Sequence, residues 1–350
     1  ALPISERLRG YLAERTVIER LVDFGHAPIF PDADAFPVIV SVRRLAVGEA
    51  LPVGHATQVT QFPREQLHKV EVPIYVAANA QAMPQESLSG APWSLATGAD
   101  EGLFAKMRTG GVPLKEYAGC KPLYGIKTGF NEAFIVDTPT RNRLVQEDPR
   151  SDDVLKKFLR GQDVARWSPE WSGLWMIFAR RGICIDDYPA IKRHLEGYKE
   201  QLEPKPKDFT GVKWPGRKSG TYKWYELQDA VDYYEEFAKP KIVFPDILWR
   251  GDFSIDSSCS YPNNTTYILP TSDSWLIAVL NSPLMWNYLW THAQHGKDEA
   301  LRMFGEFVQG IPIAVPTKAQ RDAAEALVDR LVRATRELQS QRAGILDVLR

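Results

Sequence analysis

Short apolar runs alternate with polar and turn-forming residues along most of the chain, and this pattern predicts an α+β fold built from many short elements. The clearest predicted strands cover residues 175–179, 241–245 and 266–269, where apolar residues are bounded by glycine, proline or polar residues. Apolar residues at helical spacing predict helices over 188–200 and 274–290. We expect strands and helices to mix in one region rather than to separate along the chain.

The first part of the chain has its own order of elements. A helix is predicted over residues 5–15, and strands are predicted over 17–24 and 37–42, with a proline-rich loop between the two strands. Further on, the pattern predicts only weak strands, near Val59 and over 70–76. This part therefore reads as a helix followed by a small sheet.

A polar, turn-rich stretch over residues 85–97 marks a domain boundary, and a predicted helix over 101–108 begins the next region. The chain ends in a long predicted helix, residues 317–341. A heptad pattern fits this helix in two registers, although Thr335 and Arg342 interrupt one of them. The pattern is compatible both with a helix packed on its own domain and with an intermolecular coiled coil.

Composition places the chain among soluble globular proteins. Its 350 residues are 44% hydrophobic and 25% charged, with a formal net charge of −1. Three cysteines lie far apart, which favours a reducing compartment such as the cytoplasm over a disulfide framework or a zinc site. No apolar run approaches the roughly 20 residues that cross a bilayer, so we expect no membrane association.

Positive charge is concentrated in one segment of this nearly neutral chain. Between residues 205 and 223, six basic residues accompany the single acid Asp208, and aromatic residues are interleaved with them. Basic side chains beside aromatic rings suit contacts with phosphates and bases. A flexible basic surface loop is the alternative interpretation. The candidate binding residues of this segment are Lys213, Arg217, Lys218, Lys223 and Trp224.

A loop bracketed by two glycines precedes an apolar segment, residues 133–136, that is predicted to be a strand. The loop and its end carry three polar side chains that suit phosphates and base edges: Lys127, Thr128 and Asn131. The alternative for these residues is a polar loop that caps a strand.

Arg160, further along the chain, is another candidate. It either contacts a nucleic acid or forms an ion pair with Asp163.

Signals of other chemistry are incomplete. The residues after Gly119 do not have the spacing of a phosphate-binding loop, which argues against ATP hydrolysis. Pro245-Asp246 lacks the later acid and lysine of a magnesium-dependent nuclease core, and His292 and His295 have no third ligand nearby in the sequence. We therefore predict no catalytic residue and no metal-binding residue.

The glycine-bracketed loop with its strand (residues 123–137) is followed by other strings in a fixed order. These strings lie at 155–163, 192–195, 223–227, 241–245 and 278–284. The ordered set resembles the C-terminal part of adenine-specific DNA methyltransferases of the TaqI-like and single-chain (type IIG) restriction-modification class. The first helix and strands resemble the last elements of the methyltransferase domain in the same family.

The resemblance implies a division of the chain into three parts. Residues 1–85 are expected to be the terminal elements of a Rossmann-like methyltransferase sheet, residues 86–316 a target recognition domain of short mixed strands, and residues 317–350 a C-terminal helix. The expected partners are double-stranded DNA and an upstream methyltransferase domain of the same parent protein. The candidate residues above are then its expected DNA contacts, and the location is cytoplasmic.

Methyl transfer to adenine requires a glycine-rich turn for the cofactor and an Asn-Pro-Pro-Tyr-type loop for the flipped base. Neither motif occurs in the sequence. We therefore expect no cofactor and no activity in this fragment alone, and S-adenosylmethionine in a parent that methylates adenine and is possibly fused to an endonuclease. One alternative is a type I-like restriction specificity subunit. Another is a carbohydrate-binding or hydrolytic protein, since the chain contains ten tryptophans.

Overall fold

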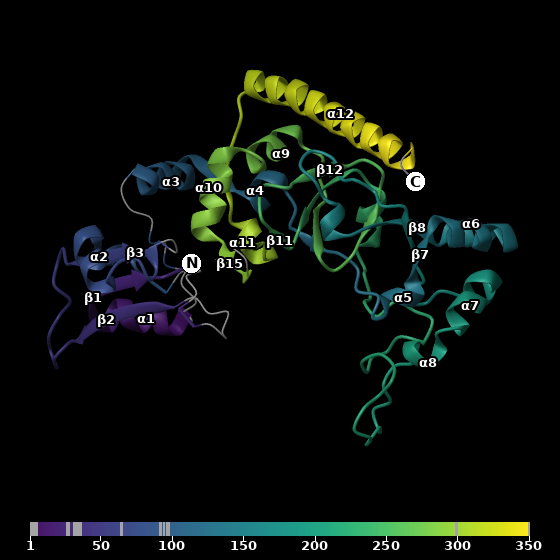
Figure 1. The fold of residues 1–350 in the computed structure, drawn as a ribbon, viewed down its shortest axis with the longest axis horizontal. Helices are drawn as coiled ribbons and strands as arrows, with labels where there is room; N and C mark the ends of the chain where they lie inside the picture. The colour runs from purple at the N-terminus through teal and green to yellow at the C-terminus, as the bar shows by residue number, and fades with distance from the viewer. Residues whose placement is uncertain are drawn as a thin grey trace. The chain divides into compact units, whose positions relative to one another are not determined.

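A computed structural model describes residues 6–25, 29–30, 37–63, 66–90, 93, 95, 99–297 and 300–348 of the chain. The chain divides into two compact units (Figure 1). Unit 1 comprises residues 1–111, 247–249 and 283–303, and unit 2 comprises 112–246, 250–282 and 304–350. Both units mix helices and strands, so the predicted α+β class is confirmed. The functional division at residues 85 and 316 stays a prediction.

The described part of unit 1 contains a four-stranded mixed sheet in the order β2-β1-β3-β4. The central strand β1 pairs antiparallel with β2 and parallel with β3, and β3 pairs antiparallel with β4. Buried Ile18, Leu21 and Val59 form its core with Trp93. The predicted first helix and strands are confirmed. The bounds are α1 (Glu6–Arg15), β1 (Thr16–Asp23), β2 (Val38–Arg44), β3 (Ala56–Gln61) and β4 (Gln81–Pro84).

Residues 70–76 are not a strand, contrary to the prediction. They overlap α2 (Val72–Asn79), which begins after Glu71 and carries Pro73 in its first turn. Proline suits this place because the first N–H groups of a helix have no intrahelical partner. The β-branched valine and isoleucine residues favour a strand, but Pro73 fits the first turn of the helix that the structure shows.

The remaining elements of unit 1 come from distant parts of the sequence. They are α3 (Ala99–Gly110), α10 (Pro283–His292), β11 (Ile247–Leu248), β15 (Gln294–His295) and β16 (Leu301–Arg302), and the three strands form a sheet in the order β11-β16-β15. The ring of Phe104 packs edge-on against Tyr288 and His292. The predicted single helix over 274–290 is wrong, because α9 (Ser274–Leu280) ends at Asn281 and α10 starts at Pro283.

Two four-stranded sheets form the centre of the described part of unit 2. The first, here called the main sheet, is antiparallel and runs β12-β10-β14-β6, with β12 (Ser254–Asp256), β10 (Lys241–Pro245), β14 (Thr266–Leu269) and β6 (Leu123–Tyr124). The second runs β13-β8-β9-β7, with β13 (Tyr261–Pro262), β8 (Leu155–Leu159), β9 (Leu174–Ile177) and β7 (Ile135–Asp137). Both sheets share one core, which includes Phe134, Phe158, Leu227, Val243 and Ile268.

The predicted strand over residues 133–136 starts later than expected. Residues Asn131–Phe134 form a single helical turn, α5, and the strand β7 begins at Ile135. The helix predicted over 188–200 is divided into α7 (Pro189–Glu196) and α8 (Lys199–Leu202). The strands at 241–245 and 266–269 have the predicted bounds, and that at 175–179 overlaps β9.

The other helices and short elements complete the fold. The helices are α4 (Leu114–Ala118), α6 (Thr138–Glu147), α11 (Gly305–Gln309) and α12 (Lys318–Val348), and the further strands are β5 (Gly111–Pro113) and β17 (Pro312–Ala314). Short 3-10 turns lie at Gln85–Ser87, Pro149–Asp153, Gly161–Asp163, Ile185–Asp187 and Tyr234–Ala238. Among the described residues, no helix is long and apolar enough to cross a membrane.

The long helix α12 packs on its own unit along α9 (Figure 1). Val328 is fully buried and Val332 nearly so, whereas Leu327 and Leu338 are more than half exposed. At its start, Arg321 Nη1 lies 2.8 Å from Asp273 Oδ2. Of the two interpretations of the heptad pattern, the structure shows the helix packed on its own domain.

Candidate nucleic-acid interface

Three loops of unit 2 are joined to one another at the ends of the two sheets. The first loop (residues 125–131) meets the third (262–266) through a hydrogen bond from Ile126 N to Pro262 O at 2.8 Å. The second loop (160–163) meets the third through Gly161 N and Thr265 Oγ1, 3.1 Å apart. These three loops are therefore joined to one another, although 130 residues (132–261) separate the first from the third in the sequence.

Gly125 allows the first and third loops to approach each other closely. A Cβ atom at this position would lie 1.9 Å from the carbonyl oxygen of Asn263. Any other residue would therefore push the two loops apart. The glycine that brackets the loop in the sequence thus serves close backbone packing.

The first loop presents two of its three predicted contact residues to solvent. Lys127 and Asn131 are exposed, whereas Thr128 is only 2% exposed. The Thr128 hydroxyl donates a hydrogen bond to Asn131 Oδ1 at 2.7 Å. The backbone N–H of Lys127 donates to Asp229 Oδ2 at 3.2 Å, which fixes the loop while the lysine side chain projects outward. Thr128 therefore shapes the loop and leaves surface contacts to its neighbours.

Arg160 forms the ion pair that was one of its two interpretations. Its Nε and Nη2 atoms donate to the two carboxylate oxygens of Asp163 at 2.9 and 2.8 Å. The hydrogen bond with Asp163 raises the pKa of Arg160 further. The arginine side chain is 32% exposed and the aspartate side chain 5% exposed. The pair holds the guanidinium in one orientation at the surface, which is compatible with a contact to a base or phosphate.

The third loop was missed as a contact surface in the sequence. Asn263 Oδ1 accepts hydrogen bonds from Thr265 N at 3.1 Å and from the hydroxyls of Thr265 and Thr266 at 2.7 and 3.2 Å. The amide of Asn264 makes no hydrogen bond with any residue that the structure describes, and its side chain is half-buried. The signal was a polar Asn-Asn-Thr turn between two apolar strands, a place where binding loops commonly lie.

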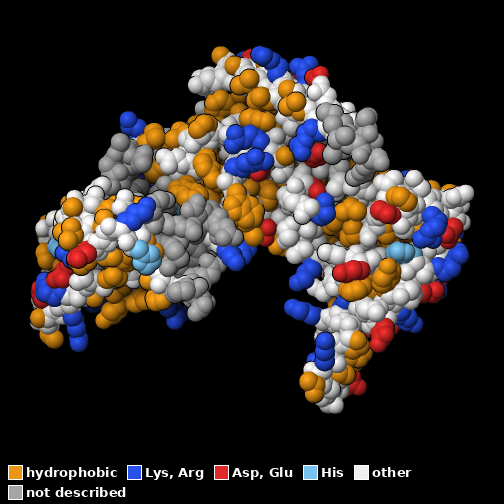
Figure 2. Space-filling view, in the orientation of Figure 1, with side chains coloured by type: hydrophobic (Ala, Val, Ile, Leu, Met, Phe, Trp, Pro, Cys, Tyr) orange, Lys and Arg blue, Asp and Glu red, His pale blue; other side chains and the backbone are white. Residues whose placement is uncertain are grey.

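The basic segment forms an extended arm, defined here as residues 199–226, which projects from α8 (Figure 1). Figure 2 shows lysine and arginine side chains gathered along this projection. Lys213, Lys218 and Lys223 are exposed, as a phosphate contact requires. Trp224 is half-buried on the core, and Lys199 Nζ lies 5.4 Å from the centre of its ring. The tryptophan therefore offers only part of its surface for stacking on a base.

Arg217 lies inside the arm and not on the exposed basic patch where the sequence placed it. The residue is 4% exposed. Its guanidinium donates five hydrogen bonds of 2.8–3.2 Å to backbone carbonyl oxygens, those of Thr128, Leu202, Lys223, Trp224 and Glu226. Burial lowers the pKa of Arg217 to about 10, so the side chain stays charged at neutral pH. A side chain with this environment cannot reach a phosphate, and Arg217 is instead the link between the arm and the first loop.

Gly129 shows how tightly the first loop packs on Arg217. Its φ angle is +87°, a conformation that favours glycine, and a Cβ there would lie 2.7 Å from Arg217 Cδ. The absence of a side chain at Gly129 therefore allows both the positive φ angle of the turn and the close contact with Arg217. Together with the Thr128 carbonyl, it makes the position of the loop depend on the arm.

The described residues contain no group of three histidine, cysteine, aspartate or glutamate side chains that could hold a metal ion. His292 donates a hydrogen bond from Nδ1 to the Tyr288 carbonyl oxygen at 2.9 Å, and His295 donates from Nε2 to the Trp290 carbonyl oxygen at 2.7 Å. Both histidines thus have backbone partners on or near α10. The three loops and the arm offer donors, acceptors and cations.

Comparison with known families identifies the class of this region. Residues 156–313 match the family described as "TaqI-like C-terminal specificity domain". This region of the chain is therefore similar to a specificity domain, in agreement with the resemblance seen in the sequence. The match includes the second and third loops and the arm, whereas the first loop (residues 125–131) precedes the matched residues.

Relatives of the chain are type II methyltransferases. The chain is 27% identical to the type II methyltransferase M.PaeR7I of Pseudomonas aeruginosa, over 93% of this chain and 56% of that protein. It is 26% identical to M.BstVI of Geobacillus stearothermophilus, over 61% of this chain and 36% of that protein. The chain thus spans about half, or less, of the length of these relatives.

One solved structure, that of the type IIL restriction-modification enzyme MmeI in complex with DNA, is similar over nearly the whole chain. The alignment covers 92% of this chain and 38% of the other, with a TM-score of 0.51 and 13% sequence identity. At this identity the likeness shows a shared fold, which again is α+β.

Proposed function

We propose that the chain is the sequence-specific DNA recognition part of a type II restriction-modification methyltransferase. The observation that carries the proposal is the joining of three donor-bearing loops, of which the second and third lie within the region that matches a specificity domain. Lys127, Asn131, Arg160 and Asn264 reach the surface there, and the lysines of the arm add positive charge. Such a surface suits duplex DNA, where phosphate contacts give affinity and base contacts give specificity.

The proposal keeps the expected division of the chain. Residues 1–85 are the last elements of a methyltransferase domain, residues 86–316 bind DNA, and residues 317–350 brace the binding domain. The parent protein methylates adenine with S-adenosylmethionine and acts in the cytoplasm. The turn and loop that hold cofactor and adenine in this family do not occur in the sequence, so no step of methyl transfer is assigned to its residues.

Two kinds of contact divide the work in this interface. Lys213, Lys218 and Lys223 project from the arm and neutralise phosphates, whatever the sequence. Asn264 and the oriented guanidinium of Arg160 face base edges, where asparagine pairs with adenine and arginine with guanine. Each good bidentate pair discriminates by about 1–3 kcal/mol against the wrong base.

The phosphate contacts are tested by the salt dependence of DNA binding. A duplex pool is first selected for sequences that the chain binds, and affinity for the selected duplex is then measured over a salt series by fluorescence anisotropy. Replacing Lys213, Lys218 and Lys223 together by glutamine should flatten the slope of log affinity against log salt by about 2–3. An unchanged slope removes the arm from the interface. The control triple replaces exposed lysines outside the arm, Lys115, Lys239 and Lys318, by glutamine.

The base contacts are tested by repeating the selection with single variants. Asn264→Ala, Lys127→Ala and Asn131→Ala should each alter the selected sequence at one or two positions more than they lower overall affinity. A uniform weakening on all sequences would assign the residue to the backbone of the duplex. Absence of duplex binding by the unchanged chain would refute the proposed function itself.

A further inference from the structure

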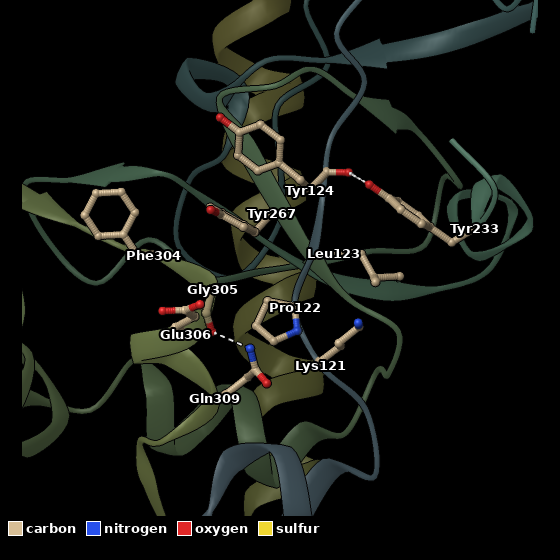
Figure 3. Close-up of a pocket in the computed structure, with 10 residues that line it drawn as sticks. All are labelled: Lys121, Pro122, Leu123, Tyr124, Tyr233, Tyr267, Phe304, Gly305, Glu306 and Gln309. Carbon is tan, nitrogen blue, oxygen red and sulfur yellow. Dashed lines mark hydrogen bonds between the residues drawn. The ribbon is translucent and has the colours of Figure 1, made fainter. Parts of the chain in front are cut away.

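A pocket of about 500 Å³ opens in unit 2 next to the first loop (Figure 3). Its size lies within the range of about 300–1,000 Å³ that is typical of small-ligand sites. Neither the family match nor the relatives assign a role to it. Ten residues line the pocket: Lys121, Pro122, Leu123, Tyr124, Tyr233, Tyr267, Phe304, Gly305, Glu306 and Gln309.

Aromatic rings form much of the pocket wall and remain open to solvent. Tyr124 is 37% exposed and Phe304 is 47% exposed. The rings of Tyr124 and Tyr267 meet edge to face with centres 4.7 Å apart. Tyr267 is held from behind by Phe244, whose ring stacks on it at 5.4 Å and 10°. The wall is therefore a supported aromatic surface.

Polar groups at the rim could orient a bound molecule. The ammonium of Lys121 forms no ion pair with the residues that the structure describes, and Glu306 is exposed on the other side of the pocket (Figure 3). Gln309 Nε2 donates to the Gly305 carbonyl oxygen at 3.1 Å. Tyr233 donates from its hydroxyl to the Tyr124 carbonyl oxygen at 2.9 Å. A cation, a carboxylate and an amide thus surround the aromatic wall.

The pocket is continuous with the candidate interface. Tyr124 directly precedes the first loop, and its strand β6 pairs with β14, which follows the third loop. Tyr233, which is hydrogen-bonded to the Tyr124 carbonyl oxygen, lies four residues after Asp229, whose carboxylate holds the backbone of Lys127. A strand of DNA on the three loops would therefore pass close to this opening.

We propose that this pocket binds a nucleotide, with the base stacked on Tyr124 and Phe304 and the phosphate paired with Lys121. Stacking on aromatic side chains contributes about 1–3 kcal/mol per base and accepts every base, since each has a π face. The positive charge of the Lys121 ammonium favours an anionic ligand over a neutral sugar. Two sources share this chemistry, an unstacked base of the bound DNA and a free mononucleotide, and only the first rests on the proposed function.

The first experiment tests the pocket without duplex DNA. The probe is the 5′-monophosphate of 2-aminopurine riboside, whose fluorescence falls when the base stacks on an aromatic ring. Tyr124→Ala and Phe304→Ala should each weaken binding by about 5–150-fold, the equivalent of one lost stacking contact. Tyr124→Phe should keep the affinity, because the ring is retained. Lys121→Gln should weaken the monophosphate but not the uncharged nucleoside. Tyr11→Ala, at an exposed tyrosine of unit 1, is the matched control.

The second experiment identifies the source of the nucleotide. The selected duplex carries one bulged 5-iodouracil, and irradiation joins this base to an aromatic ring that it touches. Cross-linked peptides containing Tyr124 or Phe304 assign the pocket to an unstacked DNA base. Binding of the free monophosphate without these cross-links assigns it to a free mononucleotide. The Tyr124→Phe variant should cross-link like the unchanged chain.

The two proposals fail in different ways. If the duplex binds but the monophosphate does not, and no cross-link reaches the pocket, the pocket proposal is overturned while the DNA-binding function stands. If the monophosphate binds and the duplex does not, the pocket proposal stands and the function is refuted. Equal binding of a neutral disaccharide at the same concentration, lost in Phe304→Ala, would overturn the nucleotide as the ligand.

Discussion

The main sheet and the arm of unit 2 each contain one buried cation, and the partners of the two cations differ. In the main sheet, Lys241 on β10 donates to Asp256 on β12 at 2.8 Å, and both side chains are fully buried. In the arm, the guanidinium of Arg217 donates to five backbone carbonyl oxygens. Lys241 thus has a carboxylate partner besides the carbonyl oxygen of Phe237 at 2.8 Å, whereas the hydrogen-bond partners of Arg217 are all backbone carbonyl oxygens.

The difference reflects what surrounds each cation. Lys241 sits beside fully buried apolar residues of the core, such as Ile242, Val243 and Phe244, so the main sheet is held mostly by apolar burial. The arm has few buried apolar side chains of its own, and its turns converge on Arg217. We infer that the main sheet unfolds with the whole unit, whereas the arm can open alone, as regions with few buried apolar contacts do.

The largest effect is expected from breaking the pair in the main sheet. Lys241→Met leaves Asp256 buried without its cation and should lower the free energy of unfolding by about 3–5 kcal/mol. The measurement is urea unfolding followed by tryptophan fluorescence. Lys241→Met with Asp256→Leu should recover most of the loss, because no buried charge remains. Lys239→Met, at an exposed neighbour on the same segment, should change stability by less than about 0.5 kcal/mol. A small loss in the single variant would show that the pair is not essential.

Arg217→Met should act on the arm more than on the whole unit. Removal of the guanidinium leaves carbonyl oxygens without a donor, and each lost hydrogen bond to a charged group is worth about 1.5–3 kcal/mol. Once the arm opens, water donates hydrogen bonds to these carbonyl oxygens and offsets part of the lost free energy. Trypsin should therefore cut after Lys207 or Lys213 much faster, while the urea midpoint falls less than in Lys241→Met. Lys218→Met is the exposed control. Equal shifts in cleavage and in the urea midpoint would contradict independent opening of the arm.

The sequence predicted the main sheet better than the arm, and the two regions show why. The strands at 241–245 and 266–269 are apolar runs between turn residues, a local signal that fixes their bounds. The burial of Arg217 depends on carbonyl oxygens from Thr128 and Leu202, far away in the sequence, so a basic residue among lysines was read as exposed. Local patterns cannot show a partner that only the fold brings close.

The candidate site shows the same limit. The sequence identified Lys127 and Asn131 in the first loop and Arg160 in the second by residue type alone. These loops adjoin, with Asn264 in a third loop beside them, because β6 pairs with β14 and β13 pairs with β8. Pairing between distant strands has no local signature. The Asn-Asn-Thr turn at residues 263–265 does carry a local signal, because it is a polar turn between two apolar strands.

The contact between Gly129 and Arg217 is a finer test of the link between arm and loop. Gly129→Ala combines a strained φ with a Cβ only 2.7 Å from Arg217 Cδ, so we expect a loss of about 1–3 kcal/mol. The matched control is Gly119→Ala, where φ is +64° but no atom lies within 4 Å of the added Cβ. The control variant should lower the free energy of unfolding only through backbone strain, and it should leave tryptic cleavage of the arm unchanged. In an Arg217→Ala background, the Gly129→Ala change should cost less than in the unchanged chain, because the clash with Cδ of residue 217 is removed and only the contacts with Gln228 remain.

The smallest expected effect is a difference in acid sensitivity between the main sheet and the arm. Burial alone would raise the pKa of Asp256, but the Lys241 ammonium and hydrogen bonds from Ser258 and Ser260 lower it below its usual value. A carboxyl with a lowered folded pKa contributes stability above its unfolded pKa of about 3.9 and loses it as the pH falls through the folded value. The carbonyl oxygens around Arg217 do not titrate. Hydrogen exchange read by mass spectrometry should therefore show peptides over 241–256 losing protection faster than peptides over 199–226 between about pH 5 and pH 2. The Lys241→Met, Asp256→Leu double variant should lose this difference, and equal acid sensitivity of both regions in the unchanged chain would refute the distinction drawn between a carboxylate and a backbone partner.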